Sequence, residues 1–318
     1  MRPPGERLPG KLLTFRSGGW VLVLAALVSA AVVFQVVRQV RGHREHAFGD
    51  GKNPATYLFA SEPTLLPRGT IVASGMPRNA VPALVEPMSV PLDNLLHAAS
   101  RKVKKLLKDP DRVIGVHLDG EARCYPIRFL NFHEVSNDTL GGRKIAVTYH
   151  PLCDSVAVFD REVEGRVLEL RVSGLLWNSS ALYFDRRDPP GGESLWSQLL
   201  ARAVTGPDAA AGRRFTLLPC VVVTLGEWRR RHPDTSVLAP DPVFLKQYPR
   251  EPYAPYYGSA TPRFPVEPYP PPPGRPAWSR AVLGPAGALL DDPGDAGEAS
   301  ASVSGFAWAL VACRPADR

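Results

Sequence analysis

Cysteine is scarce in this sequence. The chain has 318 residues but only four cysteines, which lie far apart and form no C-x-x-C pair: Cys124, Cys153, Cys220 and Cys313. Small domains that depend on disulfides are dense in cysteine, so this count excludes a disulfide scaffold. The chain is long enough for one large or two small domains with a hydrophobic core of their own.

A coherent basic surface is also missing. The net charge is +7 and the sequence pI is about 9.4, but the excess positive charge is scattered or flanks one apolar segment. The densest lysine cluster, residues 102–108, is typical of a solvated helix face. Nucleic-acid binding needs clustered basic residues with aromatic residues that stack on bases. The sequence therefore predicts no nucleic-acid partner, and it does not identify a protein partner.

One long uncharged run stands near the start. Trp20 to Val37 contains only Ser29 and Gln35 as polar residues. A helix of this length reaches about 27 Å, close to the thickness of a bilayer core, with Trp20 at one edge. We expect a single-pass transmembrane anchor over residues 20–37. The alternative is a cleaved signal peptide, because Ser29-Ala30-Ala31 resembles a cleavage region.

The anchor suggests an arrangement for the whole chain. Charges on its two sides are nearly even and do not set its orientation. One span followed by a large domain most simply places that domain outside the cytoplasm, as a membrane protein with its main part on the extracytoplasmic side. The expected parts, in order, are a cytoplasmic basic tail (1–19), the anchor (20–37), a linker leading into the domain (38–90), the main domain (91–248), a proline-rich strap with a loose loop (249–302) and a closing strand with its tail (303–318).

Periodicity within the main domain indicates mainly strands. A helix is expected after Asp93, a hairpin over 113–127 around Asp119-Gly120, and a further series of strands that ends at Phe215–Thr224. Leucine spacing predicts a helix over 193–203, and residues 226–231 are expected to form a short basic helix that ends before His232-Pro233. The fold class is α+β: a β-rich single domain with a few short helices, preceded by one transmembrane helix. The proline-rich residues 249–278 are expected to lie on the domain as an extended strap, with an SH3-type ligand as the alternative.

One stretch gathers residues that coordinate metals. His150 and Cys153 flank a proline turn, and a fold-back at Gly141-Gly142 would bring His133 near them. Two imidazoles and a thiolate suit copper, or zinc with an open fourth position. We therefore expect a copper or zinc site at His133, His150 and Cys153. Glu134 or Asp138 would orient His133 as an outer partner.

Other interpretations of the same stretch remain open. Its polar residues are also typical of a purely structural core, or of a turn around Asn137 and Asp138. Cys153 could instead be a nucleophile activated by a histidine, with Asn137 among the donors that hold an oxyanion, or it could pair with Cys124. Trp177, Trp196 and Gln198 could line a groove for sugar or peptide, although such aromatic residues are more often core.

Several longer segments of the sequence resemble a known family. Residues 113–166, followed by SGLLWNSSALYFDR, ESLWSQL and EWRRRHPDTSVL, are similar to the bacterial domain of unknown function 3179. This resemblance implies a membrane-tethered or secreted extracytoplasmic domain and carries no settled activity. The family usually reads Tyr-Cys-Pro-Leu-Cys where this chain has His150 before Pro151, so a disulfide within that motif is excluded here, whereas a metal site survives the exchange.

Three functions follow, in order of preference. The first is a membrane-anchored extracytoplasmic protein that binds copper or zinc. The second, from a different class, is a non-catalytic binding or scaffolding domain at the cell surface, with a purely structural core in the HEVSND–HPLC region. The third is a cysteine-based thiol enzyme.

Overall fold

The computed structural model describes residues 48–102, 106–187, 191–257 and 263–266, with short pieces at 21, 23–27, 29, 281–283, 289–290 and 310–311. The chain divides into two units, 1–46 and 47–318, and the second unit is the subject here. Among the described residues, none of the helices has the length and apolar character needed to cross a membrane. Most of the expected anchor, residues 20–37, lies outside the described part of the chain.

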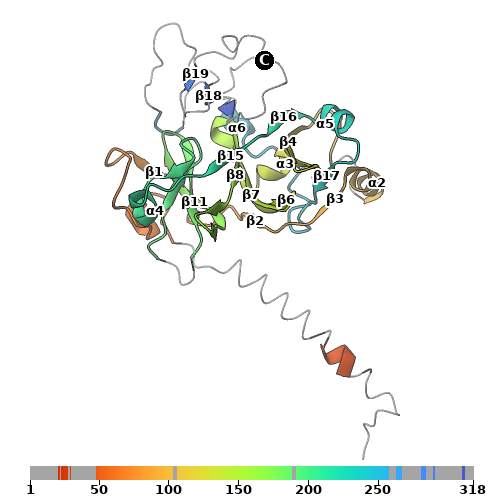
Figure 1. Ribbon diagram of the computed structural model, residues 1–318, viewed down its shortest axis with the longest axis horizontal. Helices are drawn as coiled ribbons and strands as arrows, with labels where there is room; N and C mark the ends of the chain where they lie inside the picture. Colours follow the sequence, from red (N-terminus) through yellow and green to blue (C-terminus); the bar gives the residue numbers. More distant parts are fainter. Residues whose placement is uncertain are drawn as a thin grey trace, which may run out of the picture. The chain divides into compact units, whose positions relative to one another are not determined.

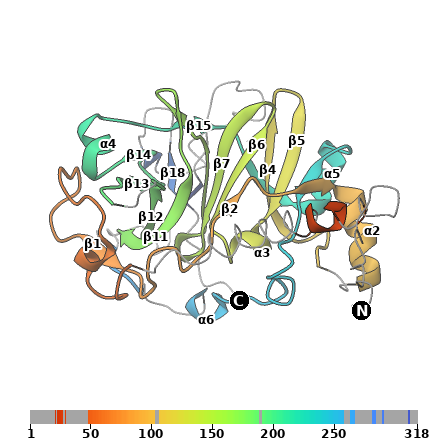
Figure 2. The same ribbon diagram turned by 90° about the horizontal axis from the view of Figure 1, so that it is seen from below.

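The folded unit is β-rich with a few short helices, as the sequence predicts. Its strands form three main sheets, which can be followed across Figure 2 from β11 through β7 to β4. The first sheet has the order β16-β4-β5-β17-β3, made of Val221–Thr224, Arg112–Leu118, Glu121–Pro126, Ser236–Leu238 and Ser89–Pro91. The outer sheet has the order β1-β11-β12-β13-β14, made of Ile71–Ala73, Leu170–Trp177, Ser180–Asp185, Leu195–Ser197 and Arg202–Ala203.

The central sheet lies between these two and carries the stretch of interest. Its order is β19-β18-β20-β8-β7-β6-β2, with β15 also paired to β8. The long antiparallel strands are β6 (Val135–Leu140), β7 (Arg143–His150) and β8 (Ser155–Asp160). The shorter ones are β2 (Leu84–Val85), β15 (Thr216–Leu218), β18 (Ala281–Leu283), β19 (Leu289–Leu290) and β20 (Leu310–Val311). A separate ribbon joins β9 (Glu162–Val163) to β10 (Arg166–Val167).

The central sheet is buried on both faces. Side chains alternate along a strand, so neighbours on β7 enter different cores. Ile145, Val147 and Tyr149 pack in the cluster shared with the first sheet. Ala146 packs instead with Tyr183 and Trp196 of the outer sheet. Strands between two cores are apolar nearly throughout, which accounts for the run of burial along β7 and β8.

The start of the domain corrects one prediction. Residues 48–90, which the sequence suggested were part of a linker, include η2 (Pro54–Tyr57), β1 and β2. Tyr57 and Leu66 are buried in a third cluster with Leu175 and Phe184 of the outer sheet. This part of the chain therefore belongs to the folded domain. Its apolar residues are too widely spaced to show a period, because the segment covers a sheet face without forming a long element.

The helices are short and lie around the sheets (Figure 1). They are α2 (Leu92–Lys102), α3 (Ile127–Leu130), α4 (Gly206–Ala210), α5 (Leu225–Arg231), α6 (Ala254–Tyr257) and the 3-10 turn η3 (Pro151–Cys153). The helix expected at 226–231 is confirmed as α5, which Thr224 caps through the backbone N–H of Glu227.

Two sequence predictions fail in the second half of the domain. Residues 193–203 do not form a helix; they contribute β13 and β14. Leu195 and Trp196 enter different clusters, as strand neighbours do, and sheet pairing overrides the leucine spacing. The single strand expected over 215–224 is instead two, β15 in the central sheet and β16 in the first sheet, so the chain changes sheets at Pro219-Cys220.

Candidate functional site

The stretch from His133 to Cys153 folds back on itself as the sequence predicts. Strands β6 and β7 pair in register around Gly141 and Gly142, whose φ angles are 56° and 73°. Such values are easiest for glycine, which has no Cβ. After β7, the turn η3 begins at Pro151 and ends at Asp154, and β8 then returns along β7.

His133 lies on the side of the first sheet. Its Nδ1 is 2.9 Å from the carbonyl oxygen of Pro82, and its Nε2 is 2.8 Å from the hydroxyl of Tyr248. The ring also packs edge-on against Phe244. The side chain is fully buried, and burial lowers the pKa of His133. Both ring nitrogens are therefore used in holding the 82 and 248 segments together.

Glu134 and His150 form a second, separate pair. Nδ1 of His150 is 3.3 Å from Oε2 of Glu134, and its Nε2 is 3.2 Å from the carbonyl oxygen of Ser179. The carboxylate of Glu134 and the carbonyl of Ser179 are both acceptors, so each ring nitrogen of His150 faces an acceptor. Ser179 lies in the turn between β11 and β12, so this pair links the central sheet to the outer sheet.

Cys153 belongs to a chain of polar contacts beside that pair. Its Sγ is 2.9 Å from Oγ of Ser155, which donates to Oε1 of Gln198 at 2.7 Å. The Gln198 amide donates in turn to Oγ1 of Thr148 at 2.9 Å. These contacts run from η3 through β8 to the outer sheet. Cys153 is 7% exposed, and no disulfide joins it to Cys124.

The predicted copper or zinc ligands are not brought together. In the described part of the chain, no three His, Cys, Asp or Glu side chains are grouped in a way that could hold a metal ion. His133 faces Tyr248 on one side of the sheet, whereas His150 faces Ser179 on the other. This arrangement does not fit a three-ligand centre. His133 and Glu134 lie in the turn before β6, and Glu134, with a φ of 56°, bonds His150 instead of sharing the surroundings of His133.

The proposed outer partners of His133 have other roles. Glu134 pairs with His150, as described above. Asp138 lies on the face toward the first sheet, where Oδ2 accepts from Arg123 at 2.7 Å and from the Tyr125 hydroxyl at 2.8 Å. Neither carboxylate orients His133. Sequence reasoning missed Arg123, Tyr125 and Tyr248 because only the sheet packing brings them to these positions.

Asn137 does not offer a donor for an oxyanion. Its amide donates to the carbonyl oxygens of Leu84 and Leu170, and its Oδ1 accepts from the backbone N–H of Leu170 at 2.8 Å. The side chain is fully buried, and its amide bonds backbone groups of β2 and β11, so it joins both strands to β6. Both of its N–H donors are therefore used within the fold.

The aromatic groove also does not form from the three predicted residues. Trp196 is fully buried in the second cluster and donates through Nε1 to Asp185, and Gln198 is 1% exposed. Trp177 packs on the third cluster instead. The buried side chains of Trp196 and Gln198 present no surface to a sugar or peptide, whereas Trp177 is half-buried at the edge of its cluster.

Part of the proline-rich segment covers the site. Oγ of Ser179 donates to the carbonyl oxygens of Phe264 and Pro265 at 3.0 and 3.1 Å. Asn131 donates to Glu251 at 3.2 Å. Burial raises the pKa of Tyr253, and the charge of Glu134 acts in the same direction. The described parts of the segment thus lie on their own domain, as expected of a strap, with α6 as a short helical piece.

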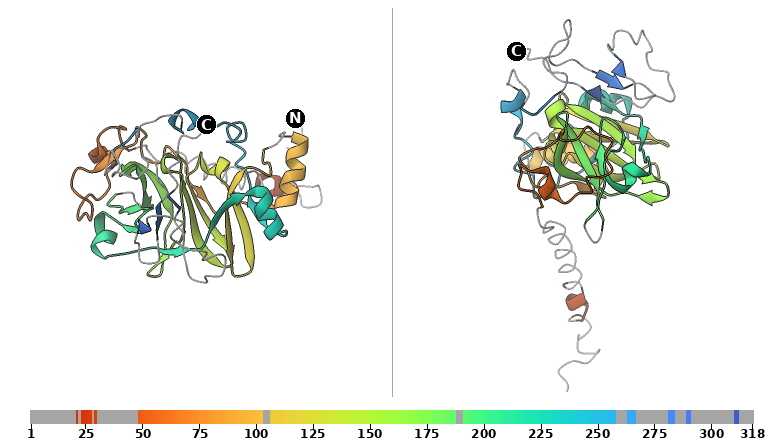
Figure 3. Two further views of the ribbon diagram at one scale, coloured as in Figure 1. Left: turned by 90° about the horizontal axis from the view of Figure 1, so that it is seen from above. Right: turned by 90° about the vertical axis from the view of Figure 1, so that its left-hand side faces the viewer.

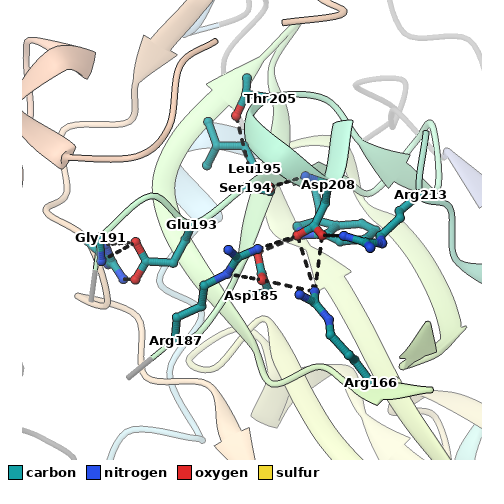
Figure 4. Close-up of polar contacts among 12 residues, drawn as sticks. Arg166, Asp185, Arg187, Gly191, Glu193, Ser194, Leu195, Thr205, Asp208 and Arg213 are labelled. Carbon is teal, nitrogen blue, oxygen red and sulfur yellow. Dashed lines mark hydrogen bonds and ion pairs between the residues drawn. The ribbon is translucent and has the colours of Figure 1, made fainter. Parts of the chain in front are cut away.

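A cluster of charged residues at the outer sheet was not predicted from the sequence (Figure 4). Asp208 of α4 is fully buried and pairs with Arg213, Arg187 and Arg166, the first two at 2.5 and 2.7 Å. Asp185 pairs with Arg187 at 2.8 Å. Burial alone would raise the pKa of Asp208, but its arginine partners outweigh burial and lower it.

Comparison with known families agrees with this fold. A family model described as "Protein of unknown function (DUF3179)" matches residues 78–285. The chain belongs to this DUF3179 family. The match begins before β3 and includes β2, which supports placing the 78–90 segment within the domain. No curated protein and no solved structure matches the chain.

The Glu134–His150 pair should stabilise the DUF3179 domain as a unit. Removing one partner of a buried pair leaves the other uncompensated and costs about 3 kcal/mol. We expect Glu134→Ala to lower the unfolding free energy by about that amount, and Glu134→Ala/His150→Ala to cost clearly less than the sum of the single changes. Denaturant unfolding measures both. The exposed pair Glu62–Arg68 is the control: Glu62→Ala should change stability by under about 0.5 kcal/mol. Strict additivity at Glu134 and His150 would contradict the pairing.

The arginine cluster predicts an acid-dependent stability. Because the pKa of folded Asp208 is lowered, its stabilisation is full above the unfolded pKa of about 3.9 and is lost as pH falls through the folded value. Asp208→Asn should therefore be less stable at pH 7 by about 3 kcal/mol. It should also lose less stability than the parent between pH 5 and pH 2 (roughly the interval over which such a carboxylate titrates). Urea unfolding measured across this pH interval tests the prediction, with the exposed Asp234→Asn variant as control. If the stability of Asp208→Asn falls with pH in parallel with that of the parent, the prediction is wrong.

Proposed function

We propose that this DUF3179 chain is a membrane-anchored extracytoplasmic protein whose folded domain is a non-catalytic binding or scaffolding module. The observation that carries the proposal is how the polar groups of the HEVSND–HPLC stretch are used. Both ring nitrogens of His133 and both of His150 face protein acceptors or hydroxyls, and both side chains are at most 3% exposed. These groups tie three sheets together and are closed to solvent.

The energetics favour the same interpretation. A buried polar group without a partner costs about 1–3 kcal/mol, so a satisfied network is maintained by selection on the fold alone. Asn137, Asp138 and Gln198 each bridge two elements in this way. Such bridges fix the register of one sheet against the next. Copper or zinc binding by His150 and Cys153 stays a prediction that the hydrogen bonding around them does not favour.

Thiol chemistry at Cys153 is the second candidate, and two observations favour it. In the described part of the chain, the buried hydroxyl of Tyr183 makes no hydrogen bond of good geometry and has only a weak contact with Thr148, and the charges of Glu134 and Cys153 both raise its pKa. Glu134 has a φ of 56°, a strained value for a residue with a long side chain. Strain and orphaned polar groups concentrate at functional sites.

Reactivity of the two comparably buried thiols separates the candidates. Cys153 is 7% exposed and Cys220 is 8% exposed. If the stretch is structural, a thiol-reactive aromatic disulfide should label Cys153 no faster than Cys220 in the native chain, and both should react on unfolding. Mass spectrometry of the labelled peptides gives the two rates, in a Cys313→Ser background. Labelling of native Cys153 more than about tenfold faster would favour thiol chemistry and count against the scaffolding proposal.

Membrane anchoring predicts how the protein fractionates. The full chain should sediment with membranes and resist alkaline carbonate, because an apolar helix of this length partitions into the bilayer. A chain lacking residues 1–40 should be recovered in the soluble fraction. Amino-terminal sequencing of the mature protein distinguishes an anchor from a signal peptide cleaved near Ala30. Recovery of the full, uncleaved chain in the soluble fraction would overturn the anchor.

A further inference from the structure

Two imidazole rings stand side by side on the first sheet, away from the stretch described above. His117 lies on β4, and His232 directly follows α5. Their ring centroids are 5.1 Å apart, with an angle of 38° between the ring planes. His117 is exposed and His232 is half-buried. Neither ring has a hydrogen-bond partner among the described residues, in contrast to His133 and His150.

The fold places these rings together for a specific reason. Gly115 has no side chain, and a Cβ there would lie 2.3 Å from the ring of Trp228. Helix α5 therefore packs closely on β4 with Trp228 over Gly115. His117 is two residues after Gly115, on the same face of the strand. His232 is one helical turn after Trp228, and its backbone N–H donates to the Trp228 carbonyl at 2.9 Å. The two contacts bring His117 and His232 into register.

The spacing suits one metal ion shared by both rings. With a metal–nitrogen bond of about 2.0 Å and roughly 1.2 Å from nitrogen to ring centre, two imidazoles stand about 4.5 Å apart at the right angle of a tetragonal copper site and about 5.2 Å apart at a tetrahedral angle. The observed separation of 5.1 Å lies within this range. Ions that prefer oxygen ligands, such as calcium and magnesium, gain little from two imidazoles. Among divalent ions that imidazole does bind, copper is held most tightly and zinc less so.

The local charges permit this binding. Burial lowers the pKa of His232, and the charges of His117 and Arg231 act in the same direction, which favours the neutral ring, the form that binds a metal. Arg231 would repel a cation, but it is paired with Glu227 at 2.5 Å. We propose that His117 and His232 form a surface site for divalent copper, with zinc as a weaker ligand. Water would complete the coordination.

Trp228 provides a direct readout of the site. Its ring lies 4.0 Å from the ring of His232, so a bound paramagnetic copper ion should quench its fluorescence. The chain has six tryptophans, so we expect a loss on the order of one sixth of the total emission, saturating at one copper per chain. The sequence also carries His43 and His46, which lie outside the described residues. Both are therefore replaced by alanine in every protein tested.

The experiment titrates copper(II) chloride into the full-length chain, with fluorescence and calorimetry measured together. Each of His117→Ala and His232→Ala should weaken binding by at least about tenfold, because loss of even an outer partner of a metal costs about 10- to 100-fold. Exposed His97→Ala is the matched control and should leave the affinity unchanged. Trp228→Phe should remove the fluorescence quenching, while copper binding measured by calorimetry persists. In the electron paramagnetic resonance spectrum of the bound copper, nitrogen hyperfine splitting should report two imidazole ligands.

Three outcomes would overturn the site: quenching with the same midpoint in His232→Ala as in the parent, an affinity that falls equally in His97→Ala, or a resonance spectrum with no nitrogen coupling. If copper binding is instead lost in His150→Ala/Cys153→Ala and kept in His117→Ala, the ion is bound at the buried stretch. That result would count against the scaffolding proposal as well. If copper binding is lost only in His117→Ala and His232→Ala, the scaffolding proposal is unaffected.

Discussion

The central sheet has a hydrophobic core on each face, and this constraint organises the domain. A strand buried on both sides must place each side chain in one core or the other. Tyr149 and His150 are neighbours in sequence, yet Tyr149 packs toward the first sheet and His150 reaches the outer sheet. The same alternation separates Asn137 from Asp138. Which face a residue occupies decides its partners more than its distance along the chain does.

Polar side chains on these strands act as ties between the sheets. Asn137 joins β6 to β11, and Asp138 joins β6 to the first sheet through Arg123. Gln198, which directly follows β13 in the outer sheet, donates to Thr148 on β7. Apolar packing of the sheets is non-directional and would tolerate small shifts between them. Buried hydrogen bonds tolerate none, because a shift leaves polar groups unpaired. The polar residues thus define the register of the stack, and this role accounts for their concentration without requiring a reaction.

The histidine at position 150 connects several parts of the domain. Its side chain is long enough to contact Glu134 and the Ser179 carbonyl at once. The ring thereby spans the gap between β7 and the turn after β11. Ser179 also bonds the 264–265 segment of the strap, so position 150 connects the central sheet, the outer sheet and the strap.

The sequence alone determined the local features. The β-rich class, the hairpin at Asp119-Gly120, the fold-back at Gly141-Gly142 and helix α5 follow from side-chain period and turn chemistry, which act over a few residues. Tertiary structure alone decided that His133 and His150 face different cores, that 193–203 is sheet, and that His117 meets His232. Those outcomes depend on the packing of segments far apart in the chain, such as Pro82 and Tyr248 on His133, which are 51 and 115 residues away, and no local pattern encodes such pairings.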